Sequence, residues 1–129
     1  MKYMLLIRSN PATWAHPMFL YQHESLSDEE RDERMAGFTA LLEEITESGE
    51  LVDSAPLAAP ATGRTVRVRD SVALITDGPF LEAKEHLAGY FVVDCVSIER
   101  AIELASRFPD ARYGAVEVRP VMDMSGLEM

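Results

Sequence analysis

Two strand-like segments are apolar on both of their faces, and this feature limits the folds open to the chain more than any other. The segments are residues 2–8 and residues 90–96, and in neither do apolar side chains alternate regularly with polar ones. A strand of this kind is covered on both sides in the folded protein. The chain therefore needs a layer of structure on each face of the sheet that these strands form.

Two amphipathic helices supply one of those layers. The first begins at a capping box, Ser27-Asp28-Glu29-Glu30, and Gly49 ends it. Its apolar side chains at helical spacing are Met35, Phe38, Leu41, Leu42 and Ile45. Ser97 caps the second helix and Pro109 ends it. The buried stripe predicted for this second helix is Ile98, Ala101, Ile102, Ala105 and Phe108.

The other segments are typical of strands and one short helix. Residues 51–60 are expected to be extended, but Pro56 and Pro60 confine them to a sheet edge or an irregular segment. A β-hairpin is predicted for residues 65–76, with its turn at Asp70-Ser71. We expect a short helix at residues 81–87 and a final strand at residues 115–121.

With the hairpin set aside, the predicted order is the βαββαβ pattern of a ferredoxin-like α+β fold with both helices on one face of the sheet. The other face then remains uncovered. A second copy of the sheet is the simplest cover, because closed two-fold dimers are the commonest oligomers. We therefore expect one domain over residues 1–122 that forms a homodimer, with a loop insertion at 9–26 and a tail at 123–129.

The charge of the chain excludes some partners. Its 22 acidic and 12 basic residues give a formal net charge of −10, and such a field repels nucleic-acid phosphates, so no direct nucleic-acid contact is expected. No apolar run approaches the roughly 20 residues that a membrane helix needs. A single cysteine, Cys95, suits a reducing compartment. We expect a cytoplasmic protein with no membrane partner.

Several segments resemble a known family. The run Asp-Gly-Pro-Phe-Leu-Glu-Ala-Lys-Glu at residues 77–85, followed by Gly89-Tyr90, is similar to the signature of the DGPF-type proteins of the YCII-related family. Residues 1–7, 65–70 and 114–121 are similar to the same family. The resemblance implies a ferredoxin-like fold that forms a dimeric α/β barrel.

The same resemblance implies two functions of different classes. Related proteins have been considered enzymes on account of a histidine and an aspartate, which suggests a small-molecule enzyme or binding protein with a small polar ligand. Others are associated with or fused to sigma factors, which suggests a non-catalytic accessory protein in transcription initiation. Residues 27–48 contain no histidine, so His23, the upstream histidine near the first helix, is the candidate substitute general base.

Asp77 is the candidate catalytic aspartate. It precedes Gly78-Pro79 at a strand end, where it either forms an Asx-type turn or presents a general base at the mouth of the barrel. Three charged residues on the predicted short helix are expected to be solvated: Glu82, Lys84 and Glu85.

Glu117 and Arg119 are candidate ligand-binding residues, with Tyr90 nearby. They alternate with Val116 and Val118 on the last strand, so we expect them to point away from the helices and toward the dimer cavity. Charges of opposite sign in that position either pair with each other or bind a polar ligand.

The connection at residues 9–26 is long for a compact domain, which is typical of a lid, a binding segment or an aromatic plug for the open end of the barrel. Its two histidines, His16 and His23, make no recognised metal spacing with His86. No nucleotide-binding or serine-hydrolase motif occurs in the sequence. We therefore expect neither a metal nor a cofactor.

Overall fold

The computed structural model describes residues 1–9, 27–78 and 86–126. The strands are β1 Lys2–Ser9, β2 Leu51–Pro56, β3 Arg64–Arg69, β4 Val72–Asp77, β5 His86–Asp94 and β6 Ala115–Pro120. The helices are α1 Asp28–Glu47, α2 Ile98–Ser106 and α3 Asp110–Tyr113, and a 3-10 turn occupies Pro60–Thr62. None of the helices in these ranges is long and apolar enough to cross a membrane.

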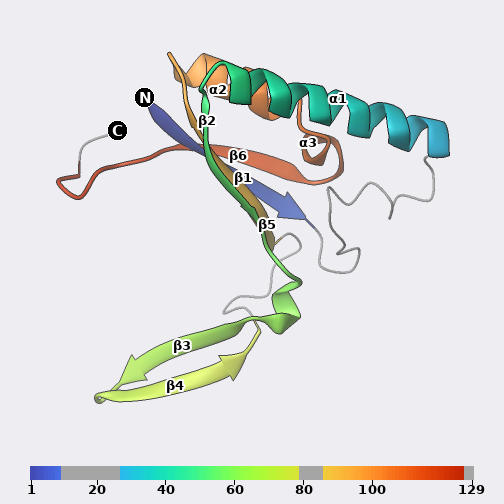
Figure 1. Ribbon diagram of the computed structural model, residues 1–129. Helices are drawn as coiled ribbons and strands as arrows, with labels where there is room; N and C mark the ends of the chain where they lie inside the picture. The colour runs from blue at the N-terminus through green and yellow to red at the C-terminus, as the bar shows by residue number, and fades with distance from the viewer. Residues whose placement is uncertain (10–26, 79–85, 127–129) are drawn as a thin grey trace.

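Four strands form one antiparallel sheet in the order β2-β5-β1-β6, with α1 and α2 on one of its faces (Figure 1). Because β5 lies between β1 and β2, the unit β1-α1-β2 is a split βαβ unit, and the architecture is compatible with a ferredoxin-like α+β fold. β2 lies at an edge of the sheet, which is one of the two positions that Pro56 allows, and Pro60 lies beyond it in the 3-10 turn.

The core lies between the sheet and the helices. Three phenylalanines, from α1, β5 and the connection after α2, meet there edge to face: the ring of Phe108 lies 4.8 Å from that of Phe91 and 5.4 Å from that of Phe38. The buried apolar side chains around them include Tyr3, Leu5, Ile7, Leu41, Ile45, Val93, Ala101, Leu104 and Ala105.

Local capping signals fix both long helices where the sequence predicts them. The Ser27 hydroxyl accepts a hydrogen bond from the Glu30 backbone N–H, and the Ser97 hydroxyl does the same for Arg100. Gly49 follows α1 with a φ of 80°. The predicted stripe of α2 is wrong at Ile98 and Ile102, which are 38% and 53% exposed. The helix turns its Ala101-Leu104-Ala105 face to the sheet instead.

Strand β5 begins earlier than the sequence predicts. His86 and Leu87 pair with Ser9 and Arg8 of β1, just beyond a register shift in the ladder, so the predicted helix over 81–87 is wrong at its last two residues. The rest of that predicted helix, including Glu82, Lys84 and Glu85, lies outside the described residues, as does the 10–26 segment. The short helix α3 was not predicted.

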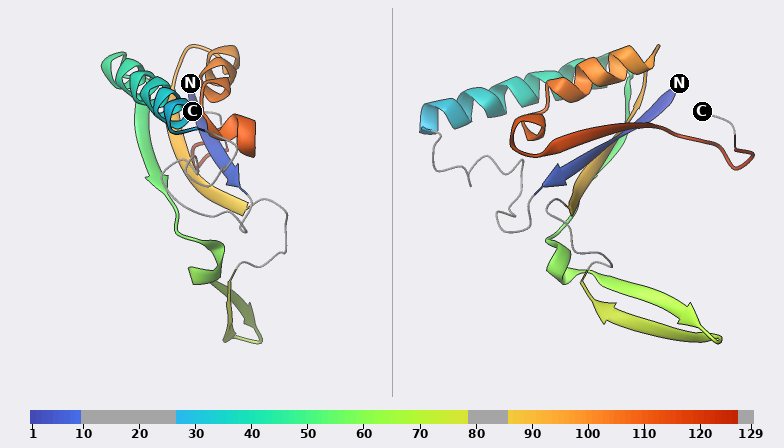
Figure 2. Two further views of the ribbon diagram at one scale, coloured as in Figure 1. Left: turned by 90° about the vertical axis from the view of Figure 1, so that its right-hand side faces the viewer. Right: turned by 180° about the vertical axis from the view of Figure 1, so that it is seen from behind.

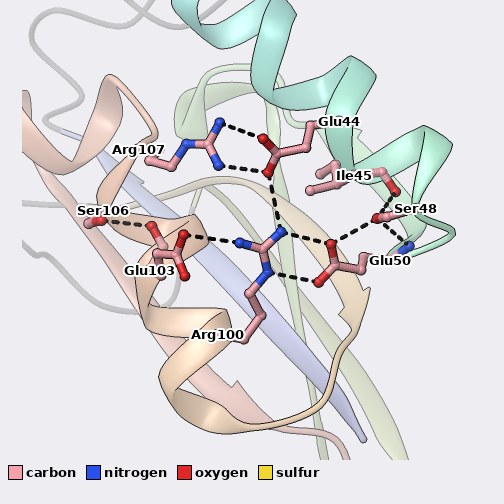
Figure 3. Close-up of polar contacts among 8 residues, drawn as sticks. All are labelled: Glu44, Ile45, Ser48, Glu50, Arg100, Glu103, Ser106 and Arg107. Carbon is pink, nitrogen blue, oxygen red and sulfur yellow. Dashed lines mark hydrogen bonds and ion pairs between the residues drawn. The ribbon is translucent and has the colours of Figure 1, made fainter.

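An arginine network joins α1, α2 and the start of β2 (Figure 3). The Arg100 guanidinium donates to both carboxylate oxygens of Glu50 at 2.9 Å and also to Glu44 and Glu103. Arg107 donates to both oxygens of Glu44. Since each of these five charged groups is held by another, the network is a structural clamp between the helices and the sheet.

Strands β3 and β4 form a separate two-stranded sheet. Its turn residues Asp70 and Ser71 have φ values of 51° and 64°, which is the geometry of a type I′ hairpin turn. The hairpin projects from the rest of the protein on the side of the sheet opposite the helices (Figures 1 and 2). We call residues 64–77 the arm, and the four-stranded sheet with its helices the body.

Candidate functional site

The face of the four-stranded sheet that points away from α1 and α2 carries the candidate site, and we call it the open face. Leu6 lies at its centre, with Tyr90 of β5 and Glu117 of β6 as its cross-strand neighbours. The next row pairs Met4 with Val92 and with Arg119 of β6. Glu117 and Arg119 thus alternate with Val116 and Val118, which pack against the core.

A cluster of three charges lies on the β1–β6 half of the open face. Arg8 donates to one carboxylate oxygen of Glu117 at 3.2 Å, and Arg119 donates to the other. The hydrogen bond from Arg8, with a smaller one from Arg119, lowers the pKa of Glu117, so this carboxylate stays ionised. Two guanidinium groups share a single carboxylate, which leaves one positive charge in excess. Such a cluster can hold a carboxylate or a phosphate.

A polar pair lies on the other half of the same face. The Tyr90 hydroxyl donates to Asp53 of β2 at 3.3 Å. The negative charge of Asp53 raises the pKa of Tyr90, so the phenol stays protonated as a hydrogen-bond donor. Half-buried apolar side chains, Met4 and Val92, lie between this pair and the charge cluster. The open face therefore offers an apolar strip with polar groups on either side.

Asp77 lies apart from the other candidate residues. It ends β4 on the arm, where it is exposed and its Oδ1 lies 3.1 Å from the Nε atom of Arg64 across the hairpin. Glu117, Arg119 and Tyr90 lie on the four-stranded sheet. The structure therefore brings Glu117 together with Arg119, and with Arg8, but places Asp77 on a different sheet.

A cavity of about 380 Å³ lies where the arm joins the body. Its wall includes Leu57, Pro60, Thr65, Gly78, His86 and Leu87. This volume falls within the range of small-molecule pockets, which begins at about 300 Å³. His86 and Arg64 are the residues of its wall with ionisable side chains.

Two residues of these sites were missed in the sequence. Arg8 follows Met4 and Leu6 at the two-residue spacing of a strand, so the same alternation places it on the open face. His86 falls within the predicted helix over 81–87, but its pairing with Ser9 places it on β5. The candidate base His23 lies outside the described residues. Within residues 1–9, 27–78 and 86–126, no group of three or more His, Cys, Asp or Glu side chains could hold a metal ion.

The sequence is similar to a known protein family and to an individual known protein. The model of the YCII-related domain matches residues 1–125. A protein of Rhizobium meliloti (strain 1021), described as uncharacterized protein R00369, is 32% identical over 112 residues, which cover 82% of this chain and 90% of that protein.

Proposed function

The chain belongs to the YCII-related family, and we propose that it is a DGPF-type, cytoplasmic homodimer that binds a small anionic molecule at the open face. The observation that carries this proposal is the cluster of Arg8, Glu117 and Arg119. In a chain with a net charge of −10, the cluster holds an excess positive charge on a sheet face that the helices leave open.

The chemistry of the face suggests the class of ligand. A guanidinium fork matches a carboxylate or phosphate in geometry as well as charge. Next to the fork, the half-buried side chains of Met4 and Val92 suit an apolar part of the same molecule, and the Tyr90–Asp53 pair suits a polar group at its far end. Adjacent strands are about 4.8 Å apart, so Tyr90 and Glu117 lie about 10 Å from each other. This span suits a small organic acid.

The second copy completes the site in this proposal. Charged side chains on an open sheet face are screened by water, and their attraction for an anion is weak there. A second sheet packed over the first would exclude water and strengthen each charge-assisted hydrogen bond. Dimerisation and ligand binding are therefore parts of one proposal.

A binding screen with a matched pair of variants tests it. Small carboxylic acids, phosphate esters and neutral analogues of each are titrated by calorimetry against the wild type, Arg119→Gln and the control Arg112→Gln. Arg112 is exposed on α3, in the helical layer. We expect an anionic ligand to bind the wild type. Its affinity for Arg119→Gln should be lower by at least about tenfold, which corresponds to about 1.4 kcal/mol, and its affinity for Arg112→Gln should equal that for the wild type.

Two outcomes would contradict the proposal. If the wild type and Arg119→Gln bind every anionic ligand with equal affinity, the open face is not the anion site. Absence of any small-molecule binding, together with binding of a purified sigma factor, would instead favour the accessory function in transcription initiation.

A further inference from the structure

The arm exposes an apolar surface that the chain's own described residues do not cover. The hairpin register places Val66, Val68 and Ile75 on one face, with Ala73 among them. Val66 and Val68 are each 59% exposed and Ile75 is 65% exposed. The opposite face alternates polar and apolar side chains, with Arg67 beside Leu74 and Arg69 beside Val72.

A two-stranded hairpin is marginally stable in water without a packing partner. A backbone hydrogen bond closes the base of the arm: the Gly78 N–H donates to the Gly63 carbonyl at 2.8 Å. Nevertheless it is a regular ladder of six pairs with a well-formed turn. An exposed apolar face on such a ladder indicates an interaction surface.

We propose that the arm of one copy packs its Val66-Val68-Ile75 face against the body of a second copy, so that two arms clasp the dimer. This inference rests on the homodimer of the proposed function and adds to it the surface that holds the copies together. The arm projects on the same side of the sheet as the open face, where the second copy would lie (Figure 2).

The area of the interface supports a second copy as the occupant. A sheet of four strands, each about six residues long, has a face of about 400 Å², so two open faces in contact bury about 800 Å². A stable interface buries about 1,200–2,000 Å². Two arms, each about 10 Å by 20 Å and each covering an equal area of the partner, add about 800 Å². Only the two contributions together reach the size of a stable dimer.

The charge distribution supports the same occupant. Arg64, Arg67 and Arg69 against Asp70 and Asp77 give the arm a net charge of +1, whereas the rest of the chain carries −11. The net charge of the arm is therefore opposite in sign to that of the rest of another copy, which favours their approach.

Sedimentation of double threonine variants tests the proposal on the full chain. Val66→Thr/Ile75→Thr changes the proposed contact face, and Val72→Thr/Leu74→Thr makes an equivalent change on the opposite face of the same hairpin. Threonine keeps the β propensity of both strands. Because each substitution occurs twice in a dimer, we expect the dissociation constant to rise at least about 100-fold for the first variant. For the second we expect a change of less than about threefold.

The other outcomes overturn the proposal, and they separate it from the proposed function. If the wild type is a dimer and both variants dimerise as tightly as it does, the arm does not hold the dimer together, and its apolar face binds a different protein. If both variants lose affinity equally, the assigned face is wrong. A monomeric wild type would refute the clasp and the homodimer together. Circular dichroism confirms that each variant is folded.

Discussion

Asp110 makes this protein less stable as the pH rises, which is opposite to the effect of a carboxylate in an ion pair. It is the first residue of α3, only 3% exposed, and its Oδ2 atom has no hydrogen-bond partner among the described residues. Burial raises the pKa of this carboxyl from 3.8 to about 7. The folded protein therefore keeps the proton over a pH range in which the unfolded chain has lost it.

The sign and size of the effect follow from linkage. Below pH 4 the carboxyl is protonated in both states, and its contribution to stability is at its maximum. Between about pH 4 and pH 7 the unfolded chain binds fewer protons, so stability falls as the pH rises, and above pH 7 the loss is complete. A shift of about three units corresponds to a loss of about 4 kcal/mol.

Urea unfolding of Asp110→Asn between pH 4 and pH 8 measures this effect. The amide cannot ionise, so we expect the variant to exceed the wild type in stability at pH 8 by about 2–4 kcal/mol and to lose that advantage at pH 4. The control is Asp32→Asn, at an exposed position on α1. A difference between wild type and Asp110→Asn that stays constant from pH 4 to pH 8 would refute the reasoning.

Two further predictions concern the body. Gly89→Ala should destabilise the fold by about 1–3 kcal/mol, because the new Cβ would lie 2.8 Å from the Ala55 carbonyl oxygen. Gly37→Ala is the control in the same thermal melts. A Cβ at Gly37 has no neighbouring atom within 4 Å, so this variant should stabilise α1 by about 0.5–1 kcal/mol. Arg100→Met should cost about 1–3 kcal/mol at pH 7, since it removes the cation that pairs with the largely buried Glu50 carboxylate. Arg100 lowers the pKa of Glu50, so this cost should shrink in urea titrations as the pH falls below the ordinary glutamate value, and a cost independent of pH would contradict the pairing.

The sequence predicts the elements whose signals are local. The Ser27 and Ser97 caps and the Asp70-Ser71 turn each depend on a few neighbouring residues, and all three are confirmed. The start of β5 was missed because the preceding charged run favours a helix, while pairing of His86 with Ser9, far away in the sequence, favours a strand. Tertiary pairing overrides local propensity at that point.

The candidate site was predictable only in part. Alternation along β6 was sufficient to place Glu117 and Arg119 on one face, and the structure confirms that they pair. Alternation alone cannot say which strands are neighbours, so the contribution of Arg8 from β1 was missed. The burial of Asp110 depends on how α3 packs beside β1 and β6, and no pattern in its own segment indicates it.

The molar mass of the wild-type protein in solution tests the central claim most directly, because the open-face site and the arm both need a second copy. Light scattering at micromolar concentration and at physiological salt measures it. We predict a stable particle of twice the chain mass of 14.4 kDa. A monodisperse, non-aggregating particle of 14.4 kDa would contradict the claim.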